Sequence, residues 1–187
     1  MKCVINCQRF LFIVLLILLW KLPAIAQTQS MPQDVLGWQE TKWGMSEGEI
    51  FKAFRSSLKP LPKNKAPQGN FMEHCIPDYM IEGINFTVLF KMDDRTKGLN
   101  EVMISHAEMP SLPNNIGFDR IASLLARKYG QPSQEKNQKE GGIEKRSAEW
   151  IFPTTTITLS HSFFKVPQLM MLTIKYIPTK GGDVNKL

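Results

Sequence analysis

The sequence predicts an α+β domain of two layers, in which an antiparallel sheet is covered on one face by two helices. Segments with helical and with strand periodicity follow one another in the order helix, strands, helix, strands. The strand segments are joined by short turns, and these fit only antiparallel neighbours because a parallel crossover needs about a dozen residues. Each helical segment carries one apolar stripe, which has to pack on another layer.

The first helix is expected over residues 47–58. Ser46 and Glu49 have the spacing of a capping box, and Ile50 and Phe54 recur on one helical face. A Lys/Pro/Gly loop is expected over 59–70. Strands with alternating polarity are then predicted over 71–76, 79–82, 84–92 and 99–106, the last two forming a hairpin.

The second helix has the clearest signals in the chain. Asn114 or Asn115 can cap it, and Gly130 supplies its stop. The polar stretch 131–146 is expected to be a solvated loop or a mobile hairpin tip. Three more strands are predicted from alternating apolar positions: Ala148, Trp150 and Phe152; Ile157 and Leu159; Met170, Leu172, Ile174 and Tyr176.

The first 26 residues have the order of a secretory signal peptide. A basic start is followed by an apolar run from Phe10 to Trp20 and a small-residue triplet that ends at Ala26. We expect cleavage between Ala26 and Gln27 and a periplasmic or secreted protein. The run is too short to span a bilayer core of ~30 Å, so no stable membrane span is expected after cleavage. The rest is expected to divide into an N-terminal arm (27–45), one domain (46–178) and a flexible tail (179–187).

Cleavage would lower the positive charge. The whole chain carries +6 at pH 7, and the leader holds three basic residues and no acidic one, so the mature charge would be +3. A charge this small, without a dense basic cluster, gives no footprint for a phosphate backbone. No nucleic-acid partner is therefore expected.

The sequence lacks the motifs that mark common catalytic sites, such as G-x-S-x-G, H-E-x-x-H and the phosphate-binding loop. His106 and His161 share strand parity with apolar residues, and His74 or Cys75 could join them as metal ligands. Zinc needs three or four such groups, and this spacing does not enforce their convergence. We therefore expect no catalytic residue, cofactor or metal. The alternative use of these histidines is hydrogen bonding at the edge of the sheet.

Two interpretations stay open for Cys75, and two for Trp38 and Trp43. Cys75 would be the one cysteine left after cleavage, either a buried inert thiol or a reactive one. Trp38 and Trp43 either fasten the entering chain onto the core or form an aromatic contact surface for a partner.

Two short motifs carry a resemblance to known proteins. Residues 41–46 (TKWGMS) and 128–132 (KYGQP) resemble the W-G-M-[ST] and K-Y-G-x-P motifs of a widespread group of uncharacterised exported proteins of Gram-negative bacteria. More distantly, the layout of 41–177 is similar to the β-lactamase-inhibitor-protein-like fold, a class that includes the small accessory lipoprotein of the outer-membrane barrel-assembly machinery. These resemblances imply protein–protein binding and transfer no catalytic residue. Unlike that lipoprotein, the chain has no cysteine at the predicted cleavage site.

Taken together, these observations predict an exported, non-catalytic module that binds another envelope protein or peptide through a sheet face or a sheet edge. Two alternatives stay open. One is a metal-dependent or thiol enzyme that uses the scattered histidines and Cys75. The other is a lipid-contacting envelope factor, which requires a contiguous exposed apolar patch.

Overall fold

The computed structural model describes residues 34–63, 66–108, 116–166 and 168–179, all within one compact unit of the chain. The predicted signal peptide with its cleavage site, the predicted cap at Asn114 or Asn115, and the end of the tail lie outside these residues. The described part contains two helices and eight strands: α2 (Glu47–Phe54), β1 (Lys59–Pro60), β2 (Phe71–Ile81), β3 (Ile84–Met92), β4 (Leu99–Glu108), α3 (Ile116–Tyr129), β5 (Gln134–Glu140), β6 (Ile143–Ile151), β7 (Thr155–Phe164) and β8 (Leu169–Pro178).

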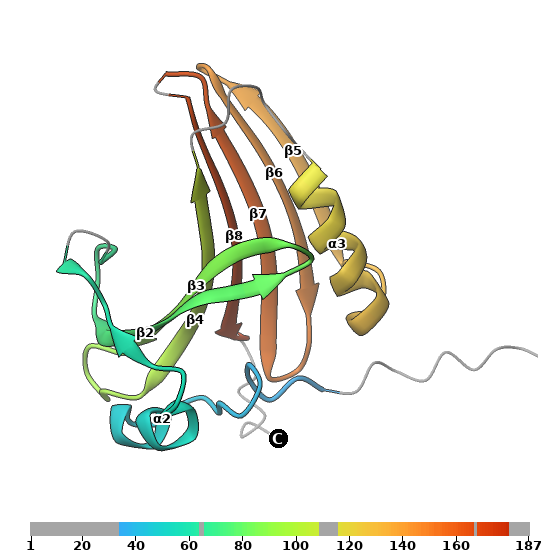
Figure 1. The fold of residues 1–187 in the computed structure, drawn as a ribbon. Coiled ribbons are helices and arrows are strands. Elements are labelled where there is room, and N and C mark those ends of the chain that lie inside the picture. Colours follow the sequence, from blue (N-terminus) through green and yellow to red (C-terminus); the bar gives the residue numbers. More distant parts are fainter. Residues whose placement is uncertain (1–33, 64–65, 109–115, 167, 180–187) are drawn as a thin grey trace, which may run out of the picture. The chain divides into compact units, whose positions relative to one another are not determined.

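The eight strands form one antiparallel sheet in the order β1-β2-β3-β4-β8-β7-β6-β5 (Figure 1). Every pair of neighbours is also consecutive in the chain except β4 and β8, which join the two halves of the sheet. The predicted mixed α+β class, with antiparallel strands and the order helix, strands, helix, strands, is therefore confirmed. The sheet dominates the fold.

The alternating directions of side chains along the central strands divide the sheet into two faces. Ile157, Leu159 and Ile174 are almost fully buried. Thr158 and Lys175, each next to one of these residues in the chain, point the opposite way. The strand registers align this alternation across the sheet. We call the face that holds Ile157, Leu159 and Ile174 the inner face, and the opposite one the outer face. One row of the inner face, from β6 to β3, reads Ala148, Leu159, Ile174, Ile104 and Val88.

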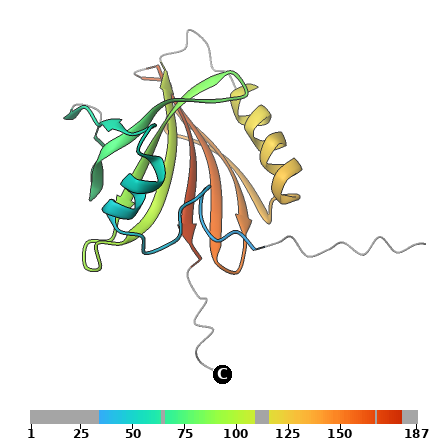
Figure 2. The ribbon, with the colours of Figure 1, turned by 60° about the horizontal axis from the view of Figure 1, so that its bottom comes forward.

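The helices add their apolar stripes to the same core. Phe118 and Ile121 of α3 and Ile50 and Phe54 of α2 belong to one buried cluster with the inner-face residues of the strands. α3 contacts β7 directly, and Figure 2 shows the two helices in a second view. Burying one such large side chain contributes about 1.5–3 kcal/mol, so the cluster is the main source of stability.

The predicted capping box at the start of α2 is confirmed. The backbone N–H of Ser46 donates to the Glu49 carboxylate at 2.8 Å, and the Ser46 hydroxyl accepts from the Glu49 N–H at 3.4 Å. Hydrogen bonds from the backbone and side chain of Ser46 lower the pKa of Glu49. The helix ends at Phe54, earlier than the predicted 58, because the following turn directs Leu58 into the core, with its N–H on the Phe54 carbonyl at 3.0 Å.

Two predicted short strands, 71–76 and 79–82, are one strand with irregularities. β2 runs through Pro77, its register shifts between Ile76 and Tyr79, and Asp78 has a φ of 54°. Proline is tolerated here because β1 pairs β2 only at His74 and Cys75, so the missing N–H of Pro77 lies where β1 offers no partner. The predicted loop over 59–70 likewise contains β1.

Of the two expectations for 131–146, the hairpin is present, and the loop is wrong for most of the stretch. β5 and β6 form a regular hairpin around Gly141 and Gly142, although every side chain of β5 is exposed. Both glycines have positive φ, 56° and 80°, which suits a two-residue turn between twisted strands. β6 is held by β7, and its pairing organises β5 without apolar side chains on β5 itself.

Neighbouring residues of β7 provide a test of the two faces. Leu159→Ala, on the inner face, is expected to lower the free energy of unfolding by about 2–5 kcal/mol because it leaves a cavity in the core. The matched variant Thr158→Ala, on the opposite face, is expected to change it by less than about 1 kcal/mol. Denaturant unfolding of both variants measures the difference, and similar losses would contradict the assigned alternation.

Candidate functional site

The tryptophan-glycine motif near residue 44 has a structural role. The Trp43 indole N–H donates to the Thr155 hydroxyl at 3.0 Å, and the Gly44 N–H donates to the Leu99 carbonyl at 2.9 Å. Gly44 has a φ of 85°, and a Cβ on Gly98 would lie 2.8 Å from Gly44. The motif therefore fastens the segment before α2 to the start of β4 and to β7.

The Trp38 ring is also buried in the core and is not part of an exposed contact surface. It is 5% exposed and stacks on Phe54 at a centroid distance of 5.7 Å. This burial confirms the packing interpretation for Trp38, and Trp43 is partly buried against the same core.

The second motif fixes the end of α3 to β6. The Gly130 N–H donates to the Ala126 carbonyl at 2.9 Å, and the Gly130 carbonyl accepts from the Trp150 indole at 2.8 Å. Tyr129 packs edge-on against Phe152 at 5.7 Å. Both motifs that carry the resemblance to the exported group therefore stabilise the fold in this chain.

The four candidate metal or catalytic residues do not converge. His74 on β2 packs edge-on against Phe51 of α2 at 5.2 Å, and Cys75, next to it, is buried and points to the other face. His106 and His161 share the inner face, but β8 lies between their strands, and both pair in register with Leu172. Among the residues that the structure describes, no group of three or more His, Cys, Asp or Glu side chains is placed to hold a metal ion.

His106 borders a cavity of about 250 Å³ between the β2–β3 turn, α3 and β8. Its Nδ1 lies 2.7 Å from the Asn85 carbonyl oxygen. The described lining includes His106 and Arg120 as ionisable groups, and its other members are apolar residues, glycines and Asn85. These lining residues offer no thiol or hydroxyl as a nucleophile and no carboxylate as a general acid or base.

His161 is a buried imidazole whose two ring nitrogens have no hydrogen-bond partner in the described structure; it is 2% exposed. Phe118 of α3 meets it edge-on at 6.5 Å, and Arg146 lies opposite it on β6. The Arg146 guanidinium stands 4.3 Å from the Phe118 ring centroid and 3.0 Å from the Asp119 carboxylate. Burial, and next the positive charge of Arg146, lower the pKa of His161, while Glu144 and Asp119 oppose the shift.

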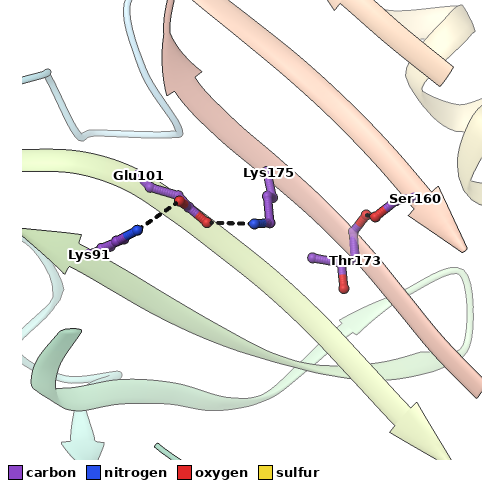
Figure 3. A network of polar contacts seen from close by, with 5 residues as sticks. All are labelled: Lys91, Glu101, Ser160, Thr173 and Lys175. Atoms are coloured by element: carbon purple, nitrogen blue, oxygen red, sulfur yellow. Dashed lines mark hydrogen bonds and ion pairs between the residues drawn. The ribbon is translucent and has the colours of Figure 1, made fainter. Parts of the chain in front are cut away.

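The opposite, outer face of the sheet is polar and half-exposed over much of β4, β8, β7 and β6, whereas Cys75 and Leu89 on the same face of β2 and β3 are buried. Figure 3 shows Glu101 between Lys91 and Lys175, with nitrogen–oxygen distances of 3.8 and 3.2 Å. The Glu101 side chain is only 12% exposed, so the two lysines on the neighbouring strands β3 and β8 shield it from solvent. Isolated surface ion pairs contribute little to stability, but this network links three long side chains from three adjacent strands.

A row of hydroxyl side chains crosses the outer face beside this network. Ser160 and Thr173, also drawn in Figure 3, are direct cross-strand neighbours. The row continues over five adjacent strands as Thr87, Ser105, Thr173, Ser160 and Ser147. Thr173 is buried, whereas the other four hydroxyl residues are half-exposed. Hydroxyls both donate and accept hydrogen bonds, so these four can bind a polar partner surface in several ways.

The comparisons with known proteins leave the family open. No protein-family model, no curated protein and no solved structure matches this chain. No helix in the described ranges has the length and apolar character needed to cross a membrane.

Part of the outer face could be predicted from the sequence, and part could not. The alternation of Thr156, Thr158 and Ser160 with apolar residues predicts a polar face on that strand. The Glu101 network was missed. Its Lys91 contact lies within the predicted β3–β4 hairpin, but its Lys175 contact depends on β8 pairing with β4, and β8 lies far along the chain from β4.

His161 gives a testable dependence of stability on pH. The folded-state pKa of His161 lies below its ordinary value of 6.5, so the unfolded chain binds a proton at this group before the folded chain does. We expect the free energy of unfolding to fall as the pH drops below 6.5, until the folded-state pKa is passed. Chemical denaturation at a series of pH values measures this loss.

The variant His161→Leu should lose this part of the pH dependence, since leucine does not titrate. The matched variant His74→Gln removes a histidine on β2 and should keep it. An unchanged acid profile in His161→Leu would exclude His161 as the source.

Proposed function

We propose that the protein is an exported, non-catalytic module that binds another envelope protein or peptide through the outer face of its sheet. The observation that carries the proposal is the contrast between the two faces. The inner face supplies the buried core, whereas the outer face presents the hydroxyl row and the Glu101 network. Polar groups spread over five adjacent strands suit the surface of a protein partner better than a small substrate, which is bound in a concave site.

We infer further that both helices cover the inner face. Support comes from their buried residues, because Ile50 and Phe54 of α2 and Ile121 of α3 share one cluster with the inner-face strand residues. The outer face beyond the buried Cys75 and Leu89 then stays available to a partner. Export is supported by the signal-peptide pattern of the first 26 residues.

The distribution of exposed apolar residues favours binding to a protein over contact with a lipid surface. The large ones come from separate elements: Leu36 before α2, Phe51 on α2, Met80 on β2, Ile116 on α3, Ile151 on β6, Val166 after β7 and Met171 on β8. Residues spread in this way do not support the contiguous apolar patch that a lipid surface requires.

Site-specific photocrosslinking in the producing cells tests the proposal. A photoreactive residue at Ser160, on the outer face, is expected to capture one reproducible envelope protein, because the partner lies within reach of the hydroxyl row. The matched position Ser123, exposed on α3, should not capture it. Glu101→Lys should lower the yield at Ser160 by reversing the central charge of the face.

Two outcomes would contradict the proposal. One is equal capture of the same protein from Ser123 and Ser160, which would remove the assignment to the outer face. The other is no specific product from any outer-face position, which would favour a function other than protein binding.

A further inference from the structure

β5 is the terminal strand of the sheet. In the described structure it pairs with β6 and ends the strand order. All seven of its residues, Gln134–Glu140, are exposed. An edge of this kind presents backbone donors and acceptors that another strand can use.

The turn determines which backbone groups face outward. Gly141 and Gly142 both have positive φ, as in a two-residue type I′ hairpin. In such a hairpin the flanking pair, Glu140 and Ile143, is hydrogen-bonded, and pairs alternate from there. Glu135, Asn137 and Lys139 therefore direct their N–H and C=O groups away from β6, toward the open edge.

The sequence of β5 is complementary to itself in the antiparallel direction. When Asn137 faces Asn137 of a second copy, Glu135 faces Lys139, Lys136 faces Gln138 and Gln134 faces Glu140. No like charges meet, and the three residues with outward backbone groups form the hydrogen-bonded pairs.

This pairing would extend an arrangement of opposite charges that already exists between β5 and β6. Lys139 already contacts Glu144 of β6 at 3.3 Å on the inner face. Glu135 of a second copy would stand on the other side of Lys139, so the lysine would lie between two carboxylates. Opposite charges directly across two strands are stabilising.

Other registers are less favourable. A shift of two residues toward the start of β5 places Lys136 opposite Lys136 of the second copy. The opposite shift runs the ladder into Gly141, in the turn. The register centred on Asn137 is the one that pairs all seven residues of the strand.

We propose that two copies of this protein associate through antiparallel pairing of their β5 strands, centred on Asn137. The two-fold axis of such a pair is perpendicular to the sheet, so the outer faces of both copies lie on the same side and form one continuous surface. The dimer does not depend on the proposed function, because it uses the edge of the sheet and leaves the outer face open.

Sedimentation analysis of the purified full chain over a range of concentrations tests the dimer. Glu135→Lys places two like-charged pairs in the interface, one for each symmetric contact, and should weaken association by about tenfold. Lys139→Glu should weaken it similarly. The control Lys145→Glu has the same change in charge as Lys139→Glu but lies on β6, away from the edge, and should leave association unchanged.

A mixture of the two weakened variants gives the sharpest result. A Glu135→Lys chain carries two lysines at these positions and a Lys139→Glu chain carries two glutamates, so their β5 strands are complementary. The mixture should associate at least as well as the original protein. Thermal unfolding of each variant checks that the fold is retained.

A monomer at every concentration would overturn the proposal. So would a dimer that is insensitive to both edge variants, or a mixture that associates no better than each variant alone. Crosslinking from the outer face would be unaffected by these results, so failure of the dimer and failure of the proposed function can be told apart.

Discussion

The structure depends on the alternation of side chains along β4, β8 and β7, the strands at the centre of the sheet. In a strand, successive residues point to opposite faces, so a slip of one residue would turn Ile174 and Tyr176 outward and bring Lys175 into the core. Burial of the apolar set fixes the register, and the register in turn sets the outer face. The row of hydroxyls and the Glu101 network are thus a consequence of how the core is built.

The same constraint explains the unusual position of His161. Its strand parity places it on the inner face, where a polar group without hydrogen bonds costs about 1–3 kcal/mol. Phe118 and Arg146 close over it, and the Asp119 carboxylate holds the guanidinium from α3. Burial in this crowded part of the core lowers the pKa of His161. Leu172 lies between it and His106. This arrangement fits packing better than proton transfer to a substrate.

Local patterns in the sequence predicted those elements whose signals are local. The capping box at Ser46 and the alternation around Ile157 and Ile174 each depend on residues a few positions apart, and both are present in the structure. The β5–β6 hairpin was expected only as an alternative to a loop, because β5 has no apolar side chains and its order comes from pairing with a strand that is itself held by β7. The separation of His106 from His161 by Leu172 follows from the strand order, which no spacing along the chain reveals. The contact between Glu101 and Lys175 on the outer face was beyond reach for the same reason.

Oxidation of two neighbouring methionines on β8 tests the division of the sheet into two faces most directly. Met170 is 4% exposed and belongs to the inner face, whereas Met171 is 37% exposed and belongs to the outer face. Brief oxidation of the folded protein with hydroxyl radicals, followed by peptide mass spectrometry, compares their rates. The account predicts that Met171 is converted to the sulfoxide well before Met170. Equal rates, or faster oxidation of Met170, would contradict it.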